Sequence, residues 1–267
     1  MSVITISRGS YSRGKEVAEK VAKRLNFECI SRDILLEASE HFHINEIKLV
    51  RAIHDAPSVL DRFTHGKEKY VSYIRAALLE HVKKDNIVYH GLAGHFFLQN
   101  ISHVLKVRVI ADIEDRLKEE MERENISAEE ARYIIKKDDN ERRKWSLKLY
   151  GQDTWDSNLY DLVVHIKTKS VDDAVDLVLH ASKFPCFQTT HESQKMVDDL
   201  ALAAEAKAVL VNVFPNSETS AKDGVVLVTI EAPVIQEEQI MKRIKSIIHG
   251  KVTGFKDVRV HVIPFTL

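Results

Sequence analysis

The sequence has little cysteine: there are two among 267 residues, and Cys29 and Cys186 lie far apart. They form neither a C-x-x-C pair nor a zinc-ligand pattern, which excludes a disulfide framework and favours a reducing compartment. The sequence also lacks a run of about 18 apolar residues and a signal-peptide-like start. Its net charge of −1 gives no global reason to bind DNA or an anionic membrane. We therefore expect a soluble, cytoplasmic protein that binds neither nucleic acid nor membrane.

Hydrophobic residues make up 44% of the chain and charged residues 30%, an ordinary balance for a globular protein. Short β-branched runs alternate with helical patterns through the first part of the chain, which predicts an α/β fold: a parallel sheet with helices on both faces. The expected strands cover residues 3–7, 87–89, 104–111 and 160–166. The expected helices cover residues 15–25, 32–39, 44–53, 67–84, 112–124, 127–149 and 174–182. We expect residues 1–183 to form one domain.

The pattern changes after this domain. Residues 184–190 contain Pro185 and little periodicity, which is typical of a linker. Residues 191–267 then predict a small α+β domain in the order αββαβ. Its expected elements are a helix at 191–207, strands at 208–214 and 225–232, a helix at 236–249 and a strand at 258–263, with a turn-rich stretch at 215–224. Apolar residues alternate along each expected strand, as in a sheet with one covered face, and the segment weakly resembles a BON-type domain.

The stretch SRGSYSRGKE, Ser7 to Glu16, follows the first expected strand and leads into the first expected helix. Within it Gly9, Gly14 and Lys15 match the phosphate-loop pattern G-x-x-x-x-G-K. Glycines allow backbone N–H groups to converge on phosphate oxygens, and the following helix directs its positive end at the anion. Glu16 stands where a Ser or Thr normally holds Mg²⁺. The alternative is an ordinary strand–turn–helix junction in which Glu16 complements the helix dipole.

Three segments resemble the cytidylate-kinase-like family, a branch of the nucleoside monophosphate kinases. ITISRGSYSRGKEVAEKVAKRL is similar to the start of that family, with Arg13 in place of a glycine, and ISRDILLEAS resembles the next segment. The stretch from Ala111 to Leu179 resembles the lid helix and the closing strand and helix. The resemblance implies a P-loop kinase fold that uses ATP and Mg²⁺. The nucleotide-binding residues that it implies are Ser7, Arg8, Ser12, Arg13, Gly14, Lys15 and Glu16.

The resemblance also implies residues for the lid and the acceptor. Asp139 and Arg142 match an Asp-x-x-Arg pair of the family's lid, and Arg142 would act with Lys15 in catalysis. Other basic residues of the helix at 127–149 are equally consistent with a solvated face that carries i,i+4 charge pairs. The lid and acceptor candidates are Arg32, His90, Gly91, Arg116, Asp139 and Arg142.

Two positions depart from the family pattern. Leu92 stands where the family commonly has an Arg that binds the acceptor nucleotide, and Glu119 stands where a second basic residue is usual. Both changes remove positive charge from the place where an acceptor phosphate would sit. His90 and His95 are candidates to line the acceptor pocket instead. No histidine pattern predicts a metal site, so Mg²⁺ would be held by phosphates, waters and Ser12 or a carboxylate.

These observations favour ATP-dependent phosphoryl transfer to a small acceptor, and the expected acceptor is a nucleoside monophosphate. The rival hypothesis is a nucleotide-binding regulatory protein with weak or no turnover, in which the C-terminal domain acts as a sensor or docking module. A third hypothesis is a structural protein that binds no nucleotide. The C-terminal domain has no predicted catalytic residue, and its candidate roles are ligand sensing, docking and self-association as a homo-oligomer.

Overall fold

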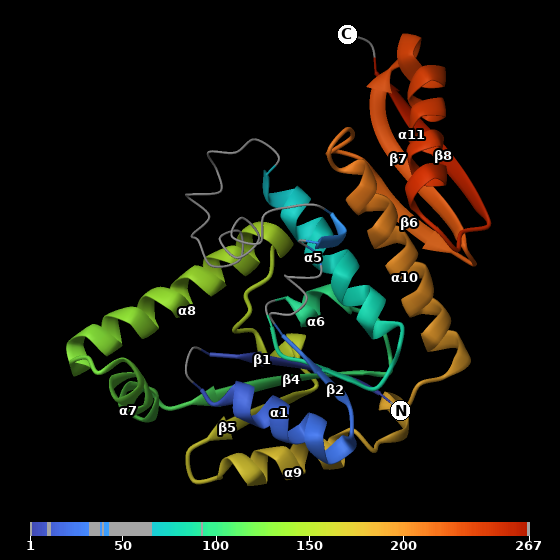
Figure 1. The fold of residues 1–267 in the computed structure, drawn as a ribbon. Coiled ribbons are helices and arrows are strands. Elements are labelled where there is room, and N and C mark those ends of the chain that lie inside the picture. Colours follow the sequence, from blue (N-terminus) through green and yellow to red (C-terminus); the bar gives the residue numbers. More distant parts are fainter. Residues whose placement is uncertain are drawn as a thin grey trace. The chain divides into compact units, whose positions relative to one another are not determined.

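The computed structural model describes residues 2–9, 12–31, 38, 40–42, 66–91 and 93–265 (Figure 1). These residues fall into two compact units. The first comprises residues 1–33, 53–61 and 85–189, and the second comprises residues 34–52, 62–84 and 190–267, each as far as it is described. The expected helix at 44–53, and all but Ala38 of the one at 32–39, lie outside the described residues.

A parallel sheet forms the centre of the first unit. Its described strands are β1 (Val3–Arg8), β2 (Glu28–Ile30), β3 (Ile87–Tyr89), β4 (Val104–Ala111) and β5 (Leu162–Ile166). They lie in the order β2-β3-β1-β4-β5, and each neighbouring pair is parallel. The predicted α/β fold class is therefore confirmed. The sequence did not predict β2, because Glu28 interrupts the continuous apolar run that marked β3.

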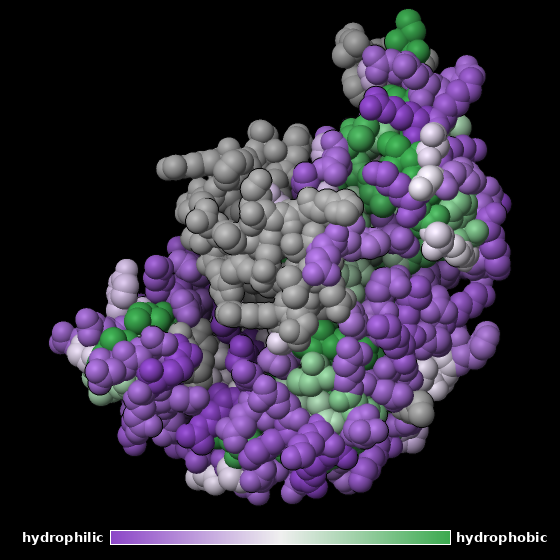
Figure 2. Space-filling view, in the orientation of Figure 1, coloured by the Kyte–Doolittle hydropathy of each residue, from purple (hydrophilic) through white to green (hydrophobic). Residues whose placement is uncertain are grey.

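Helices cover both faces of this sheet (Figure 1). The described helices of the unit are α1 (Gly14–Leu25), α6 (Gly94–Phe97), α7 (Ile113–Glu124), α8 (Ala128–Tyr150) and α9 (Val171–Ala181), with short 3₁₀ turns η1 (Ser157–Leu159) and η2 (Pro185–Phe187). Buried apolar residues of α1 and α9 form one core with alternate residues of β1 and β4, including Ile4, Ile6, Val107 and Val109. Figure 2 shows that the outer side of this part of the molecule is largely hydrophilic.

The opposite face of the sheet carries polar residues of the same strands. Because side chains alternate along a strand, Thr5, Ser7 and Arg108 point away from α1 and α9. Helix α6 packs on this face, where a Cβ at Gly94 would lie 3.3 Å from Cγ2 of Thr5. The two faces are therefore chemically different, and the polar one adjoins the candidate site.

Helices α7 and α8 form a hairpin with a small core of Leu117, Ala131 and Ile135. Asn125 ends α7 in the left-handed conformation, with φ of 54°. Ser127 then caps α8: its hydroxyl accepts a hydrogen bond from the N–H of Glu130, and the Glu130 carboxylate accepts one from the N–H of Ser127. The spacing of Ser127 and Glu130 is the sequence signature of this reciprocal capping box.

The second unit contains a small mixed sheet and three described helices. Its elements are α5 (Gly66–Val82), α10 (His191–Leu210), β6 (Glu218–Lys222), β7 (Val225–Pro233), η3 (Val234–Gln236), α11 (Glu237–Lys251) and β8 (Asp257–Phe265). β7 pairs with β6 in antiparallel and with β8 in parallel orientation. Buried residues of α10 and α11, including Leu210 and Ile244, form one core with the sheet. Asn212 Nδ2 donates to the Tyr73 hydroxyl at 3.0 Å, which ties the end of α10 to α5.

The order αββαβ holds for residues 191–267, but the first expected strand was wrong. Residues 208–210 continue α10 and residues 211–213 form a turn, because Leu210 and Val211 are buried by the helix packing. The strand β6 lies instead within the stretch expected to be turn-rich. Asp223 and Gly224 both have positive φ, 56° and 82°, and they join β6 to β7 as a two-residue hairpin loop. An Asp-Gly pair is the strongest local hairpin signal, so the sequence contained the cue.

The domain boundaries at 183 and 191 stay a prediction. The compact units differ from them in one respect, since α5 belongs with the C-terminal segment rather than with the parallel sheet. Cys29 and Cys186 are both free thiols. No helix in the described part of the chain combines the length and the apolar character needed to cross a membrane.

Candidate functional site

The loop between β1 and α1 has the backbone features of a phosphate-binding loop. Arg13, at the N-cap of α1, is left-handed with φ of 57°. A Cβ at Gly14 would lie 2.7 Å from the Cβ of Arg8, so only glycine allows the loop to turn back against the end of β1. The Gly9 N–H donates to the Val109 carbonyl at 3.3 Å. The first turn of α1 therefore opens next to the carboxyl ends of β1 and β4, and residues 10 and 11 lie outside the described residues.

Ser12 closes this loop. Its hydroxyl lies 2.9 Å from the Gly9 carbonyl oxygen and 3.0 Å from that of Val109, and the residue is 1% exposed. The hydroxyl is thus directed at backbone carbonyls, within the loop. In this arrangement it braces the loop against β4.

Lys15 and Glu16 start α1 and face different partners. The Lys15 side chain is 61% exposed, and its Nζ lies 3.6 Å from Glu19, one turn along the helix. Glu16 lies 3.1 Å from Lys20, which also pairs with Asp172 of α9. Lys15 is therefore available to move toward a phosphate, whereas the Glu16 carboxylate is directed along α1 and away from the loop.

The lid residues expected from the sequence converge on the loop. Arg142 Nη1 donates to the carbonyl oxygen of Arg8 at 3.1 Å. Arg116 Nη2 lies 2.6 Å from Asp139 Oδ2, and both side chains are nearly buried. The Arg116 guanidinium also lies over the loop, because a Cβ at Gly9 would be 3.7 Å from its Cζ. The structure thus brings three separated segments, 8–16, 116 and 139–142, to one place.

The two unusual side chains Arg13 and Glu119 pair with each other. Arg13 Nε lies 3.3 Å from Glu119 Oε2, and the side chains are 55% and 38% exposed. An exposed pair of this kind contributes about 0–1 kcal/mol. Its consequence is electrostatic, since the negative charge of Glu119 is offset by a cation on the loop itself. Nothing local in the sequence links two residues that lie so far apart.

Beneath the loop lies a buried polar group of residues, here called the Tyr160 cluster and consisting of Ser7, His95, Arg108, Thr154 and Tyr160. The Tyr160 hydroxyl lies 3.1 Å from Ser7 Oγ, 3.3 Å from His95 Nε2, 3.3 Å from Arg108 Nη1 and 2.9 Å from the Thr154 carbonyl oxygen. Arg108 Nη1 also donates to the Thr154 carbonyl. Ser7 and His95 were named from the sequence, but Arg108, Thr154 and Tyr160 were not, although a charged residue inside the apolar strand 104–111 was a usable signal.

Burial dominates the electrostatics of the cluster. It lowers the pKa of His95 to about 3, and the nearby charges of Arg108 and Lys106 act in the same direction. His95 is therefore neutral at physiological pH. It cannot add a cation to an acceptor site, which narrows its expected role to hydrogen bonding.

Two more of the acceptor candidates, His90 and Gly91, lie among the described residues. The N–H of His90 donates to the Ile30 carbonyl at 3.0 Å, and the residue is buried. A Cβ at Gly91 would collide with the Tyr89 hydroxyl, so glycine is required there. Arg32 and Leu92 lie outside the described residues.

Magnesium has no dedicated ligand set in the described part of the chain, where no group of three or more His, Cys, Asp or Glu side chains could hold a metal ion. The hydroxyl of Ser12 is also engaged within the loop.

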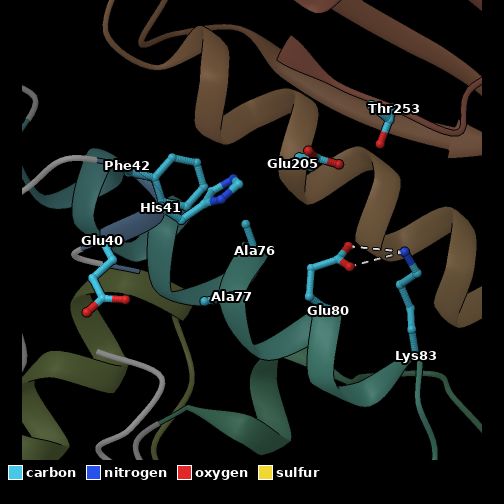
Figure 3. Close-up of a pocket in the computed structure, with 9 residues that line it drawn as sticks. All are labelled: Glu40, His41, Phe42, Ala76, Ala77, Glu80, Lys83, Glu205 and Thr253. Atoms are coloured by element: carbon cyan, nitrogen blue, oxygen red, sulfur yellow. Dashed lines mark hydrogen bonds and ion pairs between the residues drawn. The ribbon is translucent and has the colours of Figure 1, made fainter. Parts of the chain in front are cut away.

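The second unit contains a separate cavity of about 660 Å³ (Figure 3). Glu80 of α5 pairs with Lys83, which directly follows that helix, and both carboxylate oxygens lie 3.2 Å from Nζ. Glu205 of α10 lines the same cavity (Figure 3). Burial raises the pKa of Glu205, and the charge of Glu80 adds to the effect. None of the described residues that line this cavity was predicted for the nucleotide site.

The comparisons with known proteins agree with this geometry. The profile of the cytidylate kinase-like family matches residues 3–168, more than half of the chain, and this span contains both the loop between β1 and α1 and the hairpin of α7 and α8. A cytidylate kinase from Thermococcus kodakarensis is 36% identical over 87 residues, which are 33% of this chain and 44% of that enzyme. A cytidylate kinase from Sulfolobus acidocaldarius is 24% identical over 177 residues, which are 66% of this chain and 91% of that enzyme.

A solved structure shows the same fold. The crystal structure of an uncharacterised protein from Eubacterium ventriosum has a TM-score of 0.53 at 20% identity, and the match covers 68% of this chain and 98% of that one. This chain spans less than half of the Thermococcus enzyme's length, so the family assignment rests on the profile match. On that match, the chain belongs to the cytidylate kinase-like family.

Proposed function

We propose that this protein transfers the γ-phosphoryl group of ATP to a small acceptor, a nucleoside monophosphate. One observation carries the proposal: Arg142 and Arg116, from a helical hairpin, lie against the glycine-containing loop that precedes α1. Phosphoryl transfer needs cations around the migrating group, because negative charge spreads over its oxygens. A strand–loop–helix junction with no nucleotide would have no need of two arginines at this point.

The residues of the chain have distinct roles in this proposal. The N–H groups of the loop and the N-terminus of α1 bind phosphate oxygens, and exposed Lys15 neutralises the β- and γ-phosphates. Arg142 stabilises the transferred group, and Asp139 positions Arg116 over Gly9. Bound ATP supplies the phosphoryl group, and Mg²⁺ carried on its phosphates offsets part of their charge. An acceptor phosphate is already a nucleophile, so no side chain is assigned as a base.

The acceptor side of the proposal concerns position 92. Leu92 can neither donate a hydrogen bond nor carry charge, and loss of a bidentate Arg–phosphate pair costs about 2–3 kcal/mol, or roughly a hundredfold in affinity. We therefore propose that CMP is used less well than by an enzyme with an arginine there. The test is ADP release with CMP, dCMP, UMP and AMP for the wild type and for Leu92→Arg. Improved CMP use by Leu92→Arg supports the proposal, and brisk CMP turnover by the wild type contradicts it.

The rival hypothesis is a regulatory protein that binds nucleotide without turnover. The pairing of Glu119 with Arg13 weakens one argument for it, since the acidic residue is offset by a neighbouring cation. The two hypotheses differ in one measurement: a regulatory protein binds ATP in calorimetry but releases no ADP with any acceptor.

For the C-terminal segment we propose a non-catalytic role. Residues 191–267 form a small sheet covered on one face by α10 and α11, consistent with a BON-like sensing or docking module or a self-association surface. Light scattering with and without ATP tests self-association, and a monomer under both conditions removes that option.

A further inference from the structure

Arg108 is a buried cation in the centre of the first unit. It lies in β4 directly beside Ser7 of β1, and the residue is 8% exposed. Its described partners are neutral: Nη1 donates to the Thr154 carbonyl and lies 3.3 Å from the Tyr160 hydroxyl. The guanidinium carbon is 5.5 Å from the centre of the Tyr160 ring. The positive charge of Arg108 is thus stabilised by a carbonyl, a hydroxyl and the face of the Tyr160 ring.

Among the described residues, no carboxylate forms a direct ion pair with Arg108. Burial opposes the shift, but the hydrogen bond to Arg143 lowers the pKa of Asp153, and the charge of Arg108 adds to this lowering. Oδ2 of Asp153 lies 2.6 Å from Nη2 of Arg143. His95, on the other side, is neutral because burial lowers its pKa. A buried cation without a counter-ion is strongly unfavourable, and an arginine cannot escape the cost by losing its proton. An anion bound beside the guanidinium would offset this cost.

The position of Arg108 fits a ligand anion. Ser7 is the last residue but one of β1, so the backbone of Arg108 lies beside the end of the strand that leads into the loop before α1. Nε and Nη2 of Arg108 form no hydrogen bond with the described residues. Neither nitrogen is among the buried polar atoms that lack a partner, so both remain accessible from outside. These nitrogens offer the planar fork that binds a phosphate through two parallel hydrogen bonds.

We propose that Arg108 binds the phosphate of the acceptor, which is therefore a phosphomonoester dianion, with the hydroxyls of Ser7 and Tyr160 as neutral neighbours. This inference rests on the proposed kinase function and names the cation of its acceptor site. The competing explanation is that Arg108 only braces Thr154 and Tyr160.

The test uses the full chain and the variants Arg108→Met and Arg108→Lys. We expect Arg108→Met to raise KM for the acceptor monophosphate roughly 10- to 100-fold, with KM for ATP unchanged, because one charge-assisted contact is lost. Arg108→Lys keeps the charge but loses the fork, so it should show a smaller rise. Inhibition by cytidine, which has no phosphate, should be the same in the wild type and both variants. An equal loss of cytidine and CMP affinity would overturn the assignment.

Two controls separate binding from bracing and from mere loss of charge. Tyr160→Phe removes the hydroxyl of the cluster and keeps the cation, so a bracing role predicts the same acceptor KM in Tyr160→Phe and Arg108→Met. Arg24→Met removes an arginine of α1 that pairs with Asp176, and it should leave acceptor KM unchanged. If the wild type releases no ADP at all, the proposed function fails. The role of Arg108 can then still be tested by calorimetric titration of CMP, UMP and AMP. Equal monophosphate affinities in the wild type and Arg108→Lys would overturn that role.

Discussion

His95 shows at the scale of one residue how burial sets protonation. The unfolded chain takes up a proton near pH 6.5, whereas burial and nearby cations lower the folded pKa to about 3. The unfolded state therefore binds more protons between these values, and the free energy of unfolding decreases as pH falls through this window. The decrease from this one group is at most about 1.4 kcal/mol per pH unit.

We predict that His95→Gln flattens this part of the stability profile. Urea unfolding at about pH 7 and about pH 5 measures it, and the difference between the two should be smaller in the variant. His191→Gln, which changes an exposed histidine at the start of α10, is the matched control. An unchanged pH dependence in His95→Gln would show that the folded protein tolerates a protonated His95.

Residue-level prediction from the sequence was limited by separation along the chain. Gly14 and Lys15 could be predicted as site residues because the loop is a local pattern. Arg13 and Glu119 form an ion pair although they lie far apart in the chain. Arg108 donates a hydrogen bond to the Thr154 carbonyl, which belongs to a turn that no sequence pattern predicted. Such partners are fixed by the packing of β4 against the segment after α8, which no local pattern contains.

At the scale of elements, the junction of β1 and α1 depends on close backbone approach. We predict that Gly14→Ala lowers stability by about 1–3 kcal/mol and weakens ATP binding, since the new Cβ would press on the Cβ of Arg8 at 2.7 Å. Gly250→Ala in α11 is the matched control, because nothing lies within 4 Å of its Cβ. That change should stabilise the protein by about 0.5–1 kcal/mol. Thermal unfolding distinguishes the two signs, and a stable Gly14→Ala with full ATP affinity would contradict the loop geometry.

Elements with local signals were predicted well. The capping boxes at Ser127 and Ser170 mark the starts of α8 and α9, and β4 matches its expected bounds. β6 was missed because Glu218–Lys222 is polar, and its strand character comes from hydrogen bonds to β7. The apolar run at 208–214 misled for the opposite reason: it is buried by helix packing, and short apolar runs do not distinguish a strand from a helix.

At the scale of the whole molecule, α5 bears on the predicted division of the chain into two domains. It precedes β3 in the chain, yet it packs with α10 in the second unit. Tyr73 of α5 is 1% exposed there, and its hydroxyl accepts a hydrogen bond from Asn212. A chain that ends at residue 183 lacks α10 and leaves this side of α5 uncovered. We expect such a fragment to unfold at a lower temperature than the full chain and to bind a hydrophobic dye. A fragment as stable as the full chain would show that α5 needs no partner.

The central claim is that the loop before α1 binds the phosphates of ATP. Isothermal titration of ATP into the wild type, Lys15→Ala and Lys23→Ala tests it most directly, because Lys15 starts α1 and Lys23 ends the same helix. We predict that Lys15→Ala weakens ATP binding by about 1–3 kcal/mol, the range of a charge-assisted contact. Lys23→Ala should bind ATP like the wild type. Equal ATP affinity in all three proteins, or no ATP binding by the wild type, would contradict the account.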